Sequence, residues 1–384
     1  MEKTKEFIKE KGMPRRSFLK LAGLSSVGLS LGFPLNTKWA IAGEPKSKKM
    51  NANWLIDPIT GNKYFVQNDL LTQWANEERY VLARHDGWWW AFQVREFNSE
   101  FHDWWIAEKT WYYDQLIAQF EEGIAPNVPN GGHHHPMLTT YGAKWFNRGD
   151  SQFHLNTTPK GFTIIPKPDQ IDYVMNEIQK IYDDPNADLP VDVFKKRREL
   201  YQNKDLWDKS RFATLELYTG RPIDSEDTDG NYGFNETHTF QNIMENSMAT
   251  LTYMSLYNTD GTQSYFDGNK DETPTFEFRG FCWLISYYNP NLTENTYEKK
   301  IADYINQAHC GYHGGSCHVA TNIFLITEEF NNSPGYAEGR GKRVVPEFSY
   351  GVSNNMKVAK TDLKMKNMTR AEKMELLRKL RIPV

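Results

Sequence analysis

The amino-acid sequence predicts an α+β fold, with a helix-rich N-terminal half and a C-terminal half that carries an antiparallel sheet. Before about residue 220, apolar side chains recur at helical spacing, whereas after it polar and apolar side chains alternate between turn signals. The chain has 384 residues, of which 14% are aromatic, which is typical of a folded protein with a large core. No apolar run is long enough to span a membrane, so we do not expect an integral membrane protein.

Segments of the N-terminal half predict four helices. They cover residues 68–84, 101–122, 168–183 and 191–209. The second is the strongest, because six large apolar side chains recur along it near helical spacing. The fourth is highly charged and is expected to face solvent. Many aromatic residues lie between Trp88 and Tyr113, and they favour a buried core over a surface that stacks on a glycan or another flat ligand.

The C-terminal half predicts strands and two further helices. Strands are expected at residues 250–257, 262–266, 275–288 and 319–327, and helices at 293–309 and from 369 onward. The turn sequence 258–261 predicts a hairpin, and Gly280 marks a bulge within its strand. The predicted organisation is a leader (1–42), a linker (43–53), a helix-rich aromatic region (54–220), an α+β region (221–355) and a C-terminal helix (356–384).

Residues 1–42 read as a leader outside the fold. Lysines precede Arg15-Arg16-Ser17-Phe18-Leu19-Lys20, a Gly/Ser-diluted apolar segment follows, and Ala40-Ile41-Ala42 is a small-x-small site for a signal peptidase. This leader resembles the signal peptide of bacterial twin-arginine (Tat) translocation. The resemblance implies transient contact with the Tat translocase and export to the periplasm in a folded state, often with a cofactor already loaded. Retention of the segment as a membrane anchor is the alternative.

Composition and missing motifs exclude several function classes. The net charge is −4, and the basic leader accounts for part of the positive charge, so nucleic acid is not an expected partner. The sequence has neither a dinucleotide-binding nor a phosphate-binding glycine loop, so no nucleotide cofactor is expected. It also lacks a serine-hydrolase elbow. Three cysteines are too few for an iron–sulfur cluster.

The densest group of metal-ligand side chains lies within one ten-residue segment. It contains His309, Cys310, His313, Cys317 and His318. Imidazole and thiolate suit Cu, Fe or Zn. The glycines between them oppose a continuous helix, so we expect a helix end followed by a tight loop, which can still chelate a metal ion because glycine permits sharp turns. A disulfide between the two cysteines is the main alternative and is partly compatible with metal binding. Covalent haem fits poorly, because the two cysteines are too far apart for the attachment motif.

Two further groups are weaker candidates. His133 and His135 would share one face of an extended segment and could contribute to the metal site, although a surface loop with hydrogen-bonded imidazoles is the plainer interpretation. Glu236 and His238 alternate in the same way, so they are candidates for a general base.

These observations favour an exported, metal-dependent oxidoreductase that uses Cu or Fe on a small molecule, with Zn as another possible ion. The histidines that follow the leader and the absence of other catalytic motifs support this hypothesis. A second hypothesis is a non-enzymatic ligand-binding protein or an accessory subunit of an exported complex, with the aromatic block gripping a glycan or a partner subunit. A third is a glycan-processing hydrolase, for which no sequence spacing identifies the paired carboxylates.

Overall fold

A computed structural model describes most of the chain after residue 52. The described residues are 53–61, 63–67, 69–75, 78–85, 88–123, 133–142, 155–214, 238–254, 274–286, 289–290, 292, 296–313, 320–333, 341–347 and 356–359. Several predicted features lie outside these residues. They are the Tat-like leader, Glu236, Cys317, His318, the hairpin turn at 258–261 and the C-terminal helix from 369. The side chains of His238, His309, Cys310 and His313 also lie outside the description.

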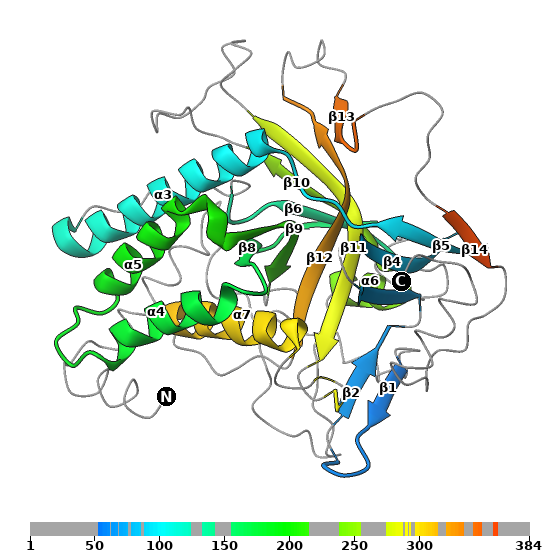
Figure 1. Cartoon of the computed structure of the whole chain (residues 1–384), viewed down its shortest axis with the longest axis horizontal. Helices are drawn as coiled ribbons and strands as arrows, with labels where there is room; N and C mark the ends of the chain where they lie inside the picture. Colours follow the sequence, from blue (N-terminus) through cyan, green and yellow to red (C-terminus); the bar gives the residue numbers. More distant parts are fainter. Residues whose placement is uncertain are drawn as a thin grey trace, which may run out of the picture.

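The centre of the described fold is an eight-stranded antiparallel sheet (Figure 1). Seven strands follow the order β7-β6-β10-β11-β12-β9-β8, and β13 pairs with β12. The strands are β6 (Met137–Tyr141), β7 (Leu155–Pro159), β8 (Thr163–Pro166), β9 (Trp207–Thr214), β10 (Met248–Met254), β11 (Thr275–Ser286), β12 (Ala320–Asn331) and β13 (Lys342–Val345). The predicted strands at 250–257, 275–288 and 319–327 correspond to β10, β11 and β12.

The predicted irregularity at Gly280 is present where β11 pairs with β12. The register shifts between Arg279 and Gly280. A Cβ atom at position 280 would lie 1.9 Å from the carbonyl oxygen of Leu325, so only glycine permits this close approach of the two strands.

A second, four-stranded sheet has the order β14-β5-β4-β3, and a separate hairpin pairs β1 with β2. These strands are β1 (Asn53–Ile56), β2 (Lys63–Val66), β3 (Leu70–Ala75), β4 (Glu78–His85), β5 (Trp88–Gln93) and β14 (Met356–Ala359). Gln67, which is buried and directly follows β2, connects the β1–β2 hairpin to the large sheet. Its amide nitrogen donates to the carbonyl oxygens of Ile243 and Cys282, and its amide oxygen accepts a hydrogen bond from the backbone N–H of Leu284.

The prediction of an α+β fold with a helix-rich N-terminal half was wrong. The described part is sheet-rich, its N-terminal portion begins with five strands, and the helix expected at 68–84 is instead strands β3 and β4. Val81, Leu82 and Ala83 are consecutive and all buried. A strand that is covered on both faces shows a continuous apolar run in place of alternation, and such a run can pass for part of a helical pattern.

Five α-helices occur among the described residues, and four of them gather on one side of the large sheet. They are α3 (Ser99–Glu122), α4 (Ile171–Asp183), α5 (Val191–Gln202), α6 (His238–Glu245) and α7 (Tyr297–His313), with a short 3-10 turn, η1 (Lys204–Leu206), after α5. Figure 1 shows α3, α4, α5 and α7 to the left of β11 and β12, and β4, β5 and β14 to the right. Helices were therefore correctly expected near 101–122, 168–183, 191–209 and 293–309, although α5 ends earlier and α7 ends later than predicted.

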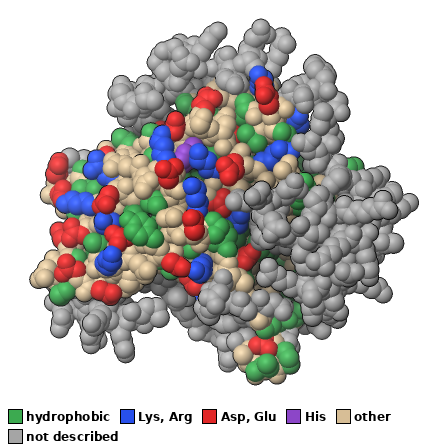
Figure 2. All heavy atoms as spheres, viewed as in Figure 1, with side chains coloured by type: hydrophobic (Ala, Val, Ile, Leu, Met, Phe, Trp, Pro, Cys, Tyr) green, Lys and Arg blue, Asp and Glu red, His purple; other side chains and the backbone are tan. Residues whose placement is uncertain are grey.

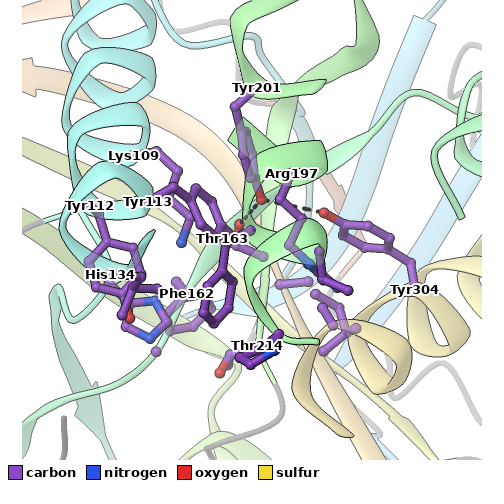
Figure 3. A pocket seen from close by; sticks show the side chains of 18 of the residues that line it. Lys109, Tyr112, Tyr113, His134, Phe162, Thr163, Arg197, Tyr201, Thr214 and Tyr304 are labelled. Carbon is purple, nitrogen blue, oxygen red and sulfur yellow. Dashed lines mark hydrogen bonds between the residues drawn. The ribbon is translucent and has the colours of Figure 1, made fainter. Parts of the chain in front are cut away.

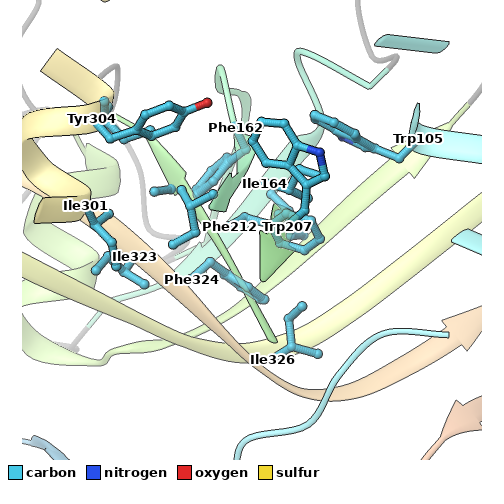
Figure 4. Close-up of a cluster of buried hydrophobic side chains, with 14 of the residues drawn as sticks. Trp105, Phe162, Ile164, Trp207, Phe212, Ile301, Tyr304, Ile323, Phe324 and Ile326 are labelled. Carbon is cyan, nitrogen blue, oxygen red and sulfur yellow. The ribbon is translucent and has the colours of Figure 1, made fainter. Parts of the chain in front are cut away.

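The core joins these helices to the sheet (Figure 4). Phe101 and Trp105 of α3 are fully buried, as are Phe162, Phe212 and Phe324 from the sheet side. Most of the aromatic residues between Trp88 and Tyr113 thus belong to the core, as the sequence favoured. No helix among the described residues has the length and apolarity needed to cross a membrane. On the outer surface of the helices, Lys and Arg side chains alternate with Asp and Glu (Figure 2, left).

Candidate functional site

A pocket of about 100 Å³ lies where α3, α5 and α7 meet the ends of β8 and β9 (Figure 3). Each helix contributes residues that are three or four positions apart, which places them on one helical face. They are Lys109, Tyr112, Tyr113 and Leu116 from α3, Val193, Phe194, Arg197 and Tyr201 from α5, and Tyr304, Ile305 and Ala308 from α7. Phe162 and Thr163 at the start of β8, Ala213 and Thr214 at the end of β9, and His134 before β6 add to the lining.

Stacked rings make part of the pocket wall rigid. The ring of Tyr201 stacks on Trp207 with a centroid separation of 4.2 Å and an interplanar angle of 11°. Tyr113 also stacks on Tyr201, at 5.8 Å and 21°. Offset-stacked rings of this kind hold one another in place, so the wall is formed before any ligand enters.

Three hydroxyl groups form a chain along the pocket. The Tyr201 hydroxyl is 3.2 Å from the Thr163 hydroxyl and 3.4 Å from the Tyr304 hydroxyl. Burial raises the pKa of Tyr304 to about 12, and it raises the pKa of Tyr201 well above its ordinary value. Both phenols therefore stay neutral near pH 7, where each can donate and accept hydrogen bonds.

The guanidinium of Arg197 lies among these hydroxyls. The side chain is only 6% exposed, and its Nη2 atom has no hydrogen-bond partner among the described residues. Burial acts to lower the pKa of Arg197, whereas the nearby tyrosine hydroxyls act to raise it, and the net direction is upward. Arginine stays protonated in proteins, so the pocket holds a permanent positive charge.

A second buried arginine shows what Arg197 lacks. Arg211 is 2% exposed, and its Nε atom lies 2.9 Å from a carboxylate oxygen of Asp208, which is equally buried. Its guanidinium also lies 4.8 Å from the centroid of the Tyr297 ring. Arg197 makes no ion pair with any carboxylate among the described residues, and none of the described residues that line the pocket is Asp or Glu.

The chemistry of this donor set favours an anion. Taking a charge out of water costs several kcal/mol unless a partner of opposite sign compensates it. A carboxylate or phosphate group presents oxygens that match the fork of a guanidinium. An anion at Arg197 would thus supply the compensation that the described protein groups do not.

His133 and His135, which the sequence offers as metal ligands, lie with His134 beside this pocket. His133 is 1% exposed, neither of its ring nitrogens has a hydrogen-bond partner among the described residues, and Nδ1 lies 3.7 Å from Glu108 Oε2. Burial lowers the pKa of His133 to about 4, against the opposing effect of Glu108. His134, which lay between the two predicted ligands His133 and His135, is the one that lines the pocket. Its ring stacks on Tyr112 at 5.7 Å.

The other predicted site residues are only partly within the described structure. His309, Cys310 and His313 belong to α7, which continues through Gly311 where the sequence predicted a loop. His309 and His313 are therefore four positions apart in one helix, as a chelating pair requires. His238 begins α6, so the strand geometry assumed for Glu236 and His238 does not apply at position 238. Among the described residues, no group of three or more His, Cys, Asp or Glu side chains is arranged to hold a metal ion.

Sequence reasoning missed Arg197, Thr163, Tyr201 and Tyr304. A signal was present for Arg197, because it falls three and four positions after Phe194 and Val193 and four before Tyr201, on the apolar face of its helix. Tyr304 lies within the helix predicted at 293–309, but the sequence did not identify it as a polar group at a pocket. Thr163 could not have been found, because Tyr201, its side-chain partner in the pocket, is 38 residues away in the sequence.

Comparisons with known proteins assign no family to this chain. No protein-family model matches it, and no curated protein sequence matches it. Among solved structures, the chain is similar to HupZ of Group A Streptococcus, crystallised with a V5 tag and a hexahistidine tag. The alignment has 15% sequence identity and a TM-score of 0.23, and it covers 53% of this chain and 87% of the HupZ chain.

Proposed function

We propose that this protein is an exported binding protein for a small organic anion, which it holds in the pocket between α3, α5 and α7. This is the class of the second hypothesis from the sequence, with a small anion in place of a glycan as the ligand. The leader that resembles a Tat signal supports the exported location. Aromatic walls, neutral hydroxyls and a buried cation support the ligand class.

The position of Arg197 is the observation that carries this proposal. It is nine-tenths or more buried, it points into the pocket (Figure 3), and its Nη2 atom lacks a hydrogen-bond partner among the described residues. A buried arginine that served stability alone would be expected to resemble Arg211, with a carboxylate at hydrogen-bond distance.

Calorimetric titration with benzoate, inorganic phosphate and sulfate tests the proposal. Benzoate is expected to bind, because its carboxylate matches the guanidinium of Arg197 and its ring matches the aromatic lining of the pocket. Arg197→Met keeps the length of the side chain but removes the charge. We expect it to weaken benzoate binding at least about thirtyfold, which corresponds to about 2 kcal/mol for a buried charge pair.

Arg198→Met is the matched control, because Arg198 is the next residue of the same helix but is 42% exposed and lies 2.8 Å from Asp114. It is expected to bind benzoate as the unmodified protein does. The proposal is wrong if none of the three anions binds, or if both methionine variants weaken binding to the same extent.

A metal-dependent enzyme stays a second candidate because of one observation in α7. His309 and His313 are four positions apart in that helix, and His309 directly follows Ala308, which lines the pocket. Metal content of the exported protein tests this candidate. We expect about one equivalent of a transition metal in the unmodified protein and almost none in the His309→Ala/His313→Ala variant. Equal, far substoichiometric metal in both proteins would contradict it.

A further inference from the structure

The hydrogen bonds along the three hydroxyls of the pocket all run in one direction. Besides its contact with Tyr201, the Thr163 hydroxyl donates to the carbonyl oxygen of Ile164, at 3.1 Å. A hydroxyl has one proton to donate, so Thr163 must accept from Tyr201. The Tyr201 proton is used in that bond, so Tyr201 must in turn accept from Tyr304. All three protons are therefore used within the chain of hydroxyls.

Tyr304 is the end of this chain that offers an acceptor to the pocket. Its proton is donated to Tyr201, whereas no described residue donates a hydrogen bond to its oxygen. The side chain is only 1% exposed and lines the pocket. A buried acceptor that lacks a donor costs free energy, so an O–H or N–H group of a ligand would bind favourably here.

The guanidinium of Arg197 lies near this acceptor. Figure 3 shows the Tyr304 hydroxyl and the Arg197 side chain pointing toward one another from α7 and α5. The Nη2 atom of Arg197 nevertheless has no hydrogen-bond partner among the described residues, so it does not donate to Tyr304. The pocket thus presents a charged donor and a neutral acceptor near one another, and a ligand can bind to both.

The ligand group that meets Tyr304 should be neutral. An ammonium could donate to the phenol oxygen, but its charge would lie near the guanidinium of Arg197 and would be repelled by it. None of the described residues that line the pocket is Asp or Glu, so none of them would offset a second positive charge. A hydroxyl donates without adding a charge.

We propose that the ligand is a small α-hydroxy acid, whose carboxylate binds Arg197 and whose hydroxyl, on the adjacent carbon atom, donates to Tyr304. This inference rests on the proposed function and specifies its ligand class. Tyr304 then determines specificity, and Thr163 is a positioning residue that sets the direction in which the Tyr304 proton points.

Calorimetric titration of the full chain with propionate, lactate and alanine tests the inference. Lactate is propionate with a hydroxyl next to the carboxylate, and alanine has an ammonium at the same position. Lactate is expected to bind about fivefold more tightly than propionate, because it gains one neutral hydrogen bond. Alanine is expected to bind more weakly than propionate. These comparisons need no variant, so they do not depend on how a substitution affects folding.

A variant at Tyr304 then locates the acceptor. Tyr304→Phe keeps the ring but removes the oxygen, and we expect the ratio of the lactate affinity to the propionate affinity to decrease to about one. Tyr173→Phe is the control, because Tyr173 is 49% exposed on α4 and is not among the residues that line the pocket. It is expected to retain the ratio of the unmodified protein.

Two variants at Thr163 test the direction of the protons. Thr163→Val removes the acceptor for Tyr201, so Tyr201 can donate to Tyr304, and Tyr304 no longer needs to donate to Tyr201. Tyr304 would then present a proton to the pocket, and the preference for lactate is expected to disappear. Thr163→Ser keeps the hydroxyl and is expected to retain the preference.

The inference is overturned if lactate binds no more tightly than propionate to the unmodified protein, or if alanine binds as tightly as lactate. It is also overturned if Tyr304→Phe retains the preference, or if Thr163→Val and Thr163→Ser give the same ratio. In each case benzoate binding that depends on Arg197 leaves the proposed function standing. If no anion binds at all, the proposed function fails together with the inference.

Discussion

Neighbouring basic residues on the two faces of helix α5 differ in whether a carboxylate pairs with them. Residues 195–198 are Lys-Lys-Arg-Arg. On the outer face, Lys195 pairs with Glu121 at 2.5 Å, Lys196 with Glu199 at 2.8 Å, and Arg198 with Asp114 at 2.8 Å. On the inner face, Arg197 points into the pocket, where no carboxylate among the described residues pairs with it.

Among the described residues of this run, only Arg197, the one at the pocket, lacks a carboxylate partner. Acidic residues are frequent around α5, and three of its four consecutive basic side chains have one. The exposed pairs contribute little to stability, because water already screens their charges. A larger effect is expected for the buried guanidinium, because it has lost most of its water and no described residue supplies a counter-charge. One helix thus carries a solvated surface on one side and a buried positive charge at a pocket on the other.

Removing the buried charge should produce the largest effect. We expect ligand-free Arg197→Met to be more stable than the unmodified protein by about 3 kcal/mol. The tyrosines that raise the pKa of Arg197 are neutral near pH 7 and supply no counter-charge there, so an apolar group of similar volume removes the desolvation cost. Urea denaturation in anion-free buffer measures this change. The same variant should gain no further stability from benzoate. A variant that unfolds more easily than the unmodified protein would mean that Arg197 has a stabilising partner, and the contrast between the two faces would disappear.

A buried carboxyl group sharpens the comparison, because it can lose its charge whereas arginine cannot. Glu329 is fully buried, its Oε2 atom accepts a hydrogen bond of 2.7 Å from the backbone N–H of Asn98, and burial raises its pKa to about 7. Because the pKa is higher in the folded state, stability is expected to decrease as the pH rises from about 4.5 to above 7.

Glu329→Gln tests this expectation, because it keeps an oxygen that can accept from Asn98 but cannot ionise. It should be more stable than the unmodified protein by about 2–3 kcal/mol at pH 8 and similar to it at pH 4. Urea denaturation across this pH range measures the difference. Glu328→Gln is the control, because Glu328 pairs with Arg343 on the outer side at 3.3 Å. If Glu329→Gln gave the same difference at both pH values, Glu329 would not be the titrating group.

The hydroxyls around Arg197 should have a smaller effect. Tyr304→Phe removes the hydroxyl that contacts Tyr201 at 3.4 Å, and we expect a loss of about 1 kcal/mol in the unfolding free energy. If the phenol dipoles stabilise the guanidinium, the same change should cost less in the Arg197→Met background. A double-mutant cycle measured by urea denaturation gives this coupling. Equal losses in both backgrounds would show that the hydroxyl acts independently of the charge.

Much of the C-terminal sheet could be predicted from the sequence, because alternation and turn chemistry are local properties. Strands β10, β11 and β12 and the irregularity at Gly280 are examples. Strands β3 and β4 could not be distinguished from a helix, because the long-range packing that covers both sides of Val81, Leu82 and Ala83 also removes the alternation that would have identified a strand.

The candidate site was less accessible to sequence reasoning. Metal-ligand residues are concentrated in one short segment of the sequence, so a local pattern is enough to identify them. The pocket is assembled from α3, α5, α7 and two strands, which are far apart in the sequence. The helix predicted at 191–209 was expected to face solvent. This holds for Lys195 and Arg198, which are about half exposed, but not for Arg197, which is buried. Only the position of Arg197 relative to Val193 and Tyr201 indicated that one charge would be buried. Assigning every residue of the helix to a face by its 3.6-residue period would have placed Arg197 on the apolar face.

The smallest expected effect concerns the outer face and completes the comparison. Arg198→Met should change the unfolding free energy by less than about 0.5 kcal/mol, because an exposed ion pair is screened by water and holds two flexible side chains in one geometry. Asp114→Asn, which removes the partner, should do the same, and both changes should vanish in high salt. A loss of several kcal/mol in either variant would mean that the outer pairs hold α5 against α3. In that case both the outer ion pairs and Arg197 would have structural roles. The lack of a carboxylate partner at Arg197 would then no longer be an argument for ligand binding.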